Sequence, residues 1–203
     1  MPLETVHKPF GQLYFAAKRL AALSERAAES RRQRENEIAL AQSATLLLVF
    51  ALEALINLVI AELGPTSETQ KRRMMGLSLT KKFARVPLLW GGKVPYDRAR
   101  EPFKTFEEMV LIRHSWVHPQ PKSMPLDEFR SKDDDPIPPH HQLRIPQLPQ
   151  DLRCWHARKA VETADQLLEW LKSESSARIN TTLLYGSAIT ERPAKASRRK
   201  GKP

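Results

Sequence analysis

The sequence is poor in the residues that build disulfide-rich, metal-chelating or strand-rich proteins. Its single cysteine, Cys154, excludes an intramolecular disulfide and a zinc site made from several cysteines. It contains no Gly-rich phosphate loop, no Gly-x-Ser-x-Gly elbow and no Cys-x-x-Cys pair. Apart from a weak pattern at residues 181–185, no substantial segment alternates with the two-residue period of a strand. These absences predict an all-α protein.

The sequence also lacks a clear membrane span and a clear secretory signal. The most apolar run, residues 46–60, is 15 residues long and includes Glu53 and Asn57, which favours a buried helix. Glu4, His7 and Lys8 stand where the apolar core of a signal peptide would begin. Together with the single cysteine, this pattern leads us to expect a cytoplasmic protein that does not bind membranes.

Prolines and positive charge are concentrated in two segments. Eight of the 16 prolines lie between Pro119 and Pro149, which predicts a Pro-rich loop inside a helical domain. Residues 191–203 contribute +5 of the net charge of +10 and have little apolar content. We therefore expect one helical domain over residues 9–175 and a flexible, disordered basic tail over 176–203. Such a tail would bind nucleic-acid phosphates, but a solubilising tail would have the same composition.

Apolar residues at helical spacing predict a bundle of four or five helices. The expected helices lie at residues 9–28, from about 34 to Leu63 with a stop at Gly64-Pro65, at 79–86, from Pro102 to 118, and after an Asp151 cap. The polar segment 66–76 is expected to be an exposed loop. Within that loop, Lys71, Arg72 and Arg73 are candidate RNA-binding residues.

A polar pair interrupts the most apolar helix. Glu53 and Asn57 are four residues apart, so they share one face of that helix. Because an unpaired buried carboxylate is costly, we expect Glu53 to meet a cation or a hydrogen-bond donor. Two interpretations remain open: a structural pair at a helix crossing or dimer seam, or a pair that supports a functional site.

The candidate functional motif is Arg113-His114-Ser115-Trp116-Val117-His118, followed by Pro119, which ends the helix. Chance predicts about 0.6 Arg-x(4)-His pairs for this composition, so the motif alone is weak evidence. Its position strengthens it, because it ends an apolar helix and follows the helix that carries Glu53. The flanking apolar residues are expected to anchor this last turn in the core: Leu111, Ile112, Trp116 and Val117.

This pattern resembles the HEPN superfamily of all-α domains, whose signature is Arg, a polar residue, three further residues and His. His114 occupies the polar position, and residues 50–57 resemble the family's long second helix. The resemblance covers roughly residues 10 to 172 and leaves the tail outside it. It implies a HEPN-like bundle with the Pro-rich loop before the last helix, and a homodimer in which two copies of the motif share one cleft.

The resemblance also implies a metal-independent endoribonuclease without a cofactor, often a toxin or an antiphage protein. In this interpretation His118 is the acid/base, Arg113 the phosphate clamp and His114 an auxiliary residue, with Glu53 and Asn57 in support. The expected partners are RNA, a second copy of the chain, and an antitoxin or other regulatory protein. Some family members carry a modifiable tyrosine two residues after the motif histidine; Gln120 stands there, which puts that route of regulation in doubt.

Three alternatives remain open at the level of sequence. In the first, the chain is a catalytically inactive HEPN-like module for dimerisation or for binding RNA or a partner. Alternatively, His114 and His118, one turn apart, ligate a metal, although no third ligand is evident. Finally, the motif is a structural helix end in which Arg113 caps carbonyl groups.

Overall fold

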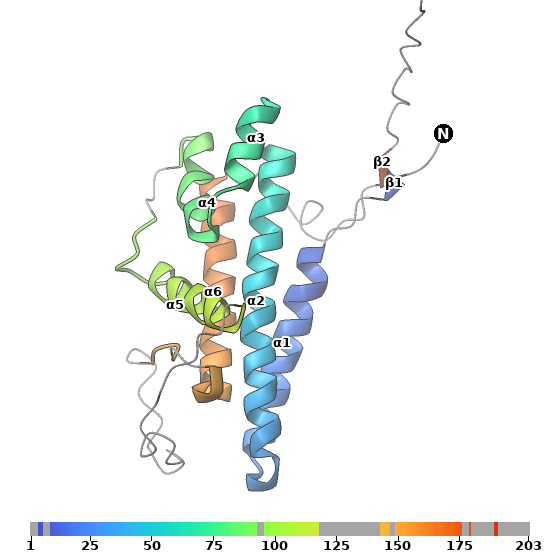
Figure 1. Ribbon diagram of the computed structural model, residues 1–203, viewed down its shortest axis with the longest axis vertical. Helices are drawn as coiled ribbons and strands as arrows, with labels where there is room; N and C mark the ends of the chain where they lie inside the picture. Colours follow the sequence, from blue (N-terminus) through green and yellow to red (C-terminus); the bar gives the residue numbers. More distant parts are fainter. Residues whose placement is uncertain are drawn as a thin grey trace, which may run out of the picture.

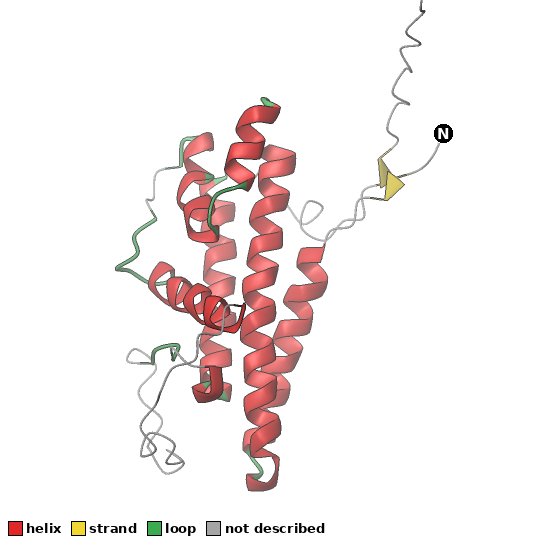
Figure 2. Ribbon diagram, viewed as in Figure 1, coloured by secondary structure: helices red, strands yellow, loops and turns green. Residues whose placement is uncertain are grey.

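The computed structural model describes residues 4–5, 9–92, 96–117, 143–146, 149–175, 179 and 189–190. Figures 1 and 2 show that this part of the chain is built almost entirely from helices, which confirms the all-α class. The α-helices described are α1 Pro9–Ala28, α2 Arg34–Leu63, α3 Glu68–Met75, α4 Leu79–Arg85, α5 Phe103–Val117 and α6 Cys154–Glu174. Two-residue strands, β1 Glu4–Thr5 and β2 Ile189–Thr190, pair antiparallel.

The long helices α1, α2 and α6 lie side by side, and α5 runs across them (Figure 1). The predicted bounds of α1 are confirmed, and its apolar stripe packs through Phe10, Tyr14 and Ala17. The Tyr14 hydroxyl donates a hydrogen bond to the Asp165 carboxylate of α6, so the two outer helices are also joined by a polar contact. Burial of these apolar faces in one shared core stabilises the bundle.

The central helix α2 has the predicted end at Leu63. The Gly64 N–H donates to the Ile60 carbonyl, and a Cβ at Gly64 would lie only 2.1 Å from that oxygen. Glycine is therefore required where the chain leaves the helix. By length and composition α2 could cross a membrane, and 56% of its most apolar window is buried inside the protein.

The predicted loop at residues 66–76 is wrong, because α3 occupies most of it. Its residues are polar but favour helix, with Glu68 in the first turn and Arg72 and Arg73 in the last, where each charge suits the helix dipole. One buried residue, Met74, is enough to hold this short helix against the core. The expected four or five helices therefore become six in the described residues.

The predicted Asp151 cap of the last helix is also wrong. Asp151 lies in a short 3₁₀ turn, and α6 begins at Cys154 with Arg153 at the N-cap position. The Arg153 N–H donates to His156 Nδ1 at 3.0 Å, and the Cys154 N–H donates to Glu37 Oε1 of α2 at 3.0 Å. A carboxylate from another helix, which local sequence spacing does not reveal, thus satisfies one of the free amide groups of α6.

The apolar residues around the motif are not all anchored in the core, so that prediction is only partly right. Ile112 is 3% exposed, but Leu111 is 62%, Trp116 38% and Val117 47% exposed. At 100° per residue Leu111 lies about 160° from the buried Met109 and faces away from the bundle. Trp116 and Val117 have the phase of the buried side but lie in the last turn of α5, where the described residues cover them only in part.

A short extended segment, residues 143–146, packs against α5 and α6. Glu108 accepts hydrogen bonds from the Ile145 N–H at 3.0 Å and from Arg144 at 3.1 Å. Buried Lys159 donates to the Leu143 carbonyl. The weak strand pattern at 181–185, most of the Pro-rich loop and most of the proposed tail lie outside the described residues.

Candidate functional site

The motif arginine lies where α5 crosses α2. The guanidinium Nη2 of Arg113 is 3.5 Å from Glu53 Oε2, and its Cζ lies 5.7 Å from the centre of the Phe50 ring. The side chains of Arg113 and Glu53 are 25% and 34% exposed, so the pair is open to solvent on one side. Glu53 therefore meets the cation that its position in an apolar helix requires.

The contacts of Arg113 leave its buried Nε donor unused. Its Nε is buried and has no hydrogen-bond partner in the described part of the protein. Guanidinium groups carry five N–H donors, and a buried donor without an acceptor is costly. The Arg113 side chain is 25% exposed, so an anion can approach the guanidinium from its solvent-facing side, which makes this crossing a candidate phosphate site.

Asn57 faces a residue that the sequence reasoning missed. Lys82 of α4 is only 4% exposed, and its ammonium donates a hydrogen bond to Asn57 Oδ1 at 2.8 Å. A signal was present in the sequence, because Lys82 is three residues from Leu79 and four from Val86 and so shares their buried face. Glu53, Asn57, Lys82 and Arg113 form the crossing cluster.

The crossing cluster carries two cations and one carboxylate. Burial lowers the pKa of Lys82 from its ordinary value, and the negative charge of Glu53 opposes that shift. Glu53 thus interacts with both Arg113 and Lys82, and the cluster has an excess of one positive charge when Lys82 is protonated. This arrangement favours binding of an anion.

The structure locates one motif histidine and leaves the other undescribed. His114 is exposed, one residue beyond Arg113 on α5. His118, the predicted acid/base, lies directly after Val117 and outside the described residues. Neither histidine is therefore placed relative to the crossing cluster by a contact.

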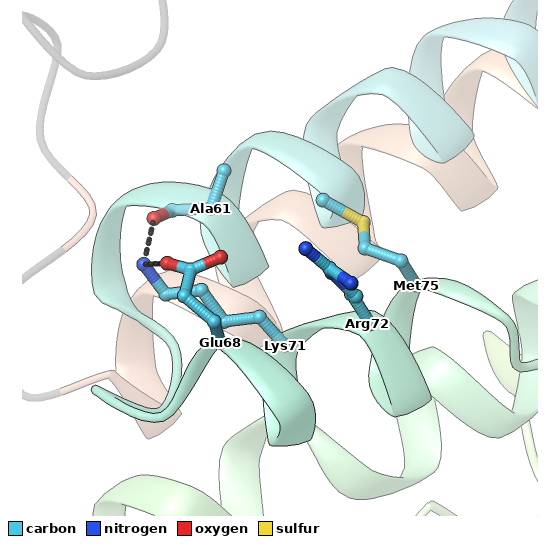
Figure 3. Close-up of a pocket in the computed structure, with 5 residues that line it drawn as sticks. All are labelled: Ala61, Glu68, Lys71, Arg72 and Met75. Carbon is cyan, nitrogen blue, oxygen red and sulfur yellow. Dashed lines mark hydrogen bonds and ion pairs between the residues drawn. The ribbon is translucent and has the colours of Figure 1, made fainter. Parts of the chain in front are cut away.

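Two of the three predicted RNA-binding residues of α3, Lys71 and Arg72, line a separate surface cavity. Figure 3 shows Lys71 and Arg72 beside Glu68, Met75 and Ala61, around a cavity of about 410 Å³. The Lys71 ammonium donates to the Ala61 carbonyl at 3.1 Å and lies 3.9 Å from Glu68. Lys71 therefore caps the end of α2, whereas Arg72 and Arg73 are exposed to solvent.

In the part of the chain that the structure describes, no three or more His, Cys, Asp or Glu residues gather closely enough to hold a metal ion. The Pro-rich loop contains an acidic stretch at residues 133–135 and a histidine pair at residues 140–141. Both lie outside the described residues.

Comparison with known proteins identifies no relative: no protein-family model, no curated protein and no solved structure matches the chain.

Proposed function

We propose that the chain is a metal-independent endoribonuclease of the HEPN type, acting without a cofactor as a cytoplasmic homodimer. Arg113 binds the scissile phosphate, His118 transfers protons and His114 assists. Glu53 and Asn57 support the arginine. A role as a toxin or antiphage protein, controlled by an antitoxin or regulatory partner, fits this activity and the resemblance of the motif.

The observation that carries the proposal is the state of Arg113. Its guanidinium is fixed by Glu53 and Phe50, yet its Nε lacks an acceptor in the described residues and the pair is partly open to solvent. A purely structural arginine would be expected to satisfy its buried donors within the fold. A phosphate oxygen that enters beside Glu53 would accept hydrogen bonds from the solvent-facing part of the guanidinium.

The chemistry needs no metal. An imidazole that titrates near neutral pH removes the proton from a ribose 2′-OH, and the resulting oxygen attacks the adjacent phosphorus. The bond to the 5′-oxygen breaks, and an imidazolium protonates that leaving oxygen. The products are a 2′,3′-cyclic phosphate and a 5′-hydroxyl. The permanently charged guanidinium stabilises the negative charge that builds up on the phosphoryl oxygens.

A second copy of the chain has a suitable surface at the same place. On α5, the motif residues Trp116 and Val117 are exposed, and so is Leu111, two residues before the motif. Leu46 and Phe50 of α2 are only half-buried. Exposed apolar residues close to a charged site favour a protein interface. A homodimer over this surface would bring two motifs together.

The test is cleavage of total RNA by the purified chain in excess chelator. Wild-type protein should leave 2′,3′-cyclic phosphate ends, and Arg113→Ala or His118→Ala should lower the rate by about 10²–10⁴-fold. Arg85→Ala, which removes an exposed arginine outside the crossing cluster, is the matched control and should cleave normally. Full cleavage by either site variant contradicts the residue assignment, and an inactive wild type contradicts the ribonuclease.

A catalytically inactive dimerisation or RNA/partner-binding module is the second candidate. The exposed apolar residues of α5 favour it, because they would serve an interface whether or not catalysis is retained. Wild-type protein that dimerises and binds RNA but leaves it intact would establish this function. Sedimentation of Trp116→Asp protein tests the surface itself, since loss of the dimer is expected in both cases.

A further inference from the structure

Lys82 enters the crossing cluster from a helix that carries none of the motif residues. It belongs to α4, which packs against α2 and α5. The neighbouring Phe83 is fully buried, and its ring centre lies 4.8 Å from that of Phe106 on α5. This aromatic contact fixes α4 in place, so the position of the Lys82 side chain is set by the core rather than by a loose surface turn.

The surroundings of Lys82 do not resemble those of a residue kept for stability alone. An ammonium has three donors, and in the described residues Asn57 Oδ1 is the one acceptor within hydrogen-bond distance of it. Burying a charged amine with so little compensation costs free energy, and a methionine of similar length would avoid that cost.

Lys82 also interacts electrostatically with Glu53. The ammonium attracts the Glu53 carboxylate, which is also the ion-pair partner of Arg113. Glu53 and Asn57 lie one turn apart on α2, so Lys82 contacts one and attracts the other. The hydrogen bond from Lys82 to Asn57 therefore places a positive charge one helical turn from Glu53, the carboxylate that pairs with Arg113.

We propose that Lys82 is a positioning residue of the RNA-cleaving site: through Asn57 and Glu53 it fixes the orientation of the Arg113 guanidinium. Its contribution to catalysis rests on the proposed function, whereas its effect on Arg113 does not. Removal of the Lys82 charge turns the guanidinium away from its productive direction, and a small misplacement of a phosphate-binding group lowers the turnover rate more than substrate binding.

The experiment compares Lys82→Met and Lys82→Gln with Lys81→Met, which removes the exposed neighbouring lysine. Both Lys82 variants should keep the helical circular-dichroism spectrum. Their kcat for RNA cleavage should fall by about tenfold to a hundredfold while KM stays within about threefold. Lys81→Met should match the wild type. Two Lys82 variants are used so that a folding failure in one leaves the other to decide.

A second measurement does not depend on catalysis. In ¹⁵N-labelled protein, the Arg113 Nε–H signal, assigned by its loss in Arg113→Lys, should move in Lys82→Met as it does in Glu53→Gln. An unchanged signal, or wild-type kcat in both Lys82 variants, overturns the inference. A wild type that leaves RNA intact while Lys82→Met still moves the signal refutes the ribonuclease and retains the positioning role.

Discussion

Two carboxylates of α2, Glu37 and Glu53, each pair with an arginine from a distant segment, but the two pairs are built differently. Glu37 and Arg153 have side chains that are 7% and 15% exposed, and Glu37 also accepts the backbone N–H of Cys154. Glu53 and Arg113 are 34% and 25% exposed, and the Arg113 Nε has no acceptor in the described residues. The Glu37–Arg153 pair lies at the N-terminal end of α6, whereas the Glu53–Arg113 pair keeps a solvent-facing side that a ligand can reach.

The separation of the two pairs makes the comparison useful. Glu37 and Glu53 are 16 positions apart, about 24 Å along the helix axis. Substitutions at that distance, without shared partners, should act independently. Variants of one pair therefore serve as controls for the other in the same protein.

The largest contrast is expected between the two arginines. Arg113→Ala should lower RNA cleavage by about a thousandfold but change the free energy of unfolding by only about 1 kcal/mol, because the pair is partly exposed. Arg153→Ala should do the reverse, since it removes a partner from a buried carboxylate. Cleavage rates and urea unfolding of both proteins check this. Equal loss of stability in the two variants would show that the pairs do not differ.

Substitution of the two carboxylates should show the same contrast in stability. Glu37→Ala should lower the free energy of unfolding by about 3 kcal/mol, because it leaves Arg153 and the Cys154 N–H without that acceptor. Glu53→Ala should cost about 1 kcal/mol or less. Chemical denaturation gives both values. A Glu53→Ala protein as unstable as Glu37→Ala would make Glu53 a structural residue.

The N-terminal cap of α6, beside the Glu37–Arg153 pair, should make the stability of the protein depend on pH. Burial, with a smaller contribution from Lys159, lowers the pKa of His156 from 6.5 to about 4. A lowered folded-state pKa means that the unfolded state binds the proton first, so stability is full above pH 6.5 and is lost as the pH falls towards 4. We expect a loss of about 2 kcal/mol over that window that His156→Gln, which can still accept the Arg153 N–H, reduces. Urea unfolding at several pH values measures it; identical pH profiles for the two proteins would refute it.

The smallest effect is expected at Lys71. Because its ammonium caps the α2 carbonyl of Ala61, Lys71→Ala should lower the free energy of unfolding by about 0.5 kcal/mol. RNA affinity should change by less than about twofold, since the side chain is already engaged. Thermal unfolding and filter binding, with Arg73→Ala for comparison, provide the measurement. A large loss of RNA affinity in Lys71→Ala would show that Lys71 contacts RNA.

The sequence was sufficient for the features that depend on local spacing. The bounds of α1 and the end of α2 at Leu63 follow from apolar periodicity and from Gly64-Pro65. The expectation that Glu53 meets a cation also follows from its neighbours alone, because the surrounding residues are too apolar to leave a carboxylate unpaired. Local patterns therefore located the helix and predicted a cation or donor beside Glu53, and the structure identifies that cation as Arg113.

The features that failed depend on contacts between distant segments. Asp151 has the right chemistry for a cap, but the cap of α6 uses His156 and Glu37, and Glu37 is more than 100 positions away. Lys82 was overlooked because a lysine in a short amphipathic helix is ordinarily exposed, and only the fold shows that Asn57 lies within reach. Trp116 and Val117 are apolar and have the phase of the buried side, yet they are exposed in the last turn of α5.

The exposure of Trp116 also gives the protein an intrinsic optical probe. The other tryptophans, Trp90, Trp155 and Trp170, are half-buried, whereas Trp116 is exposed within the motif itself. A soluble collisional quencher such as iodide should therefore reach Trp116 most easily. Covering α5 with a second copy or with RNA would shield this indole, so the native fluorescence can follow occupancy of the site without an attached dye.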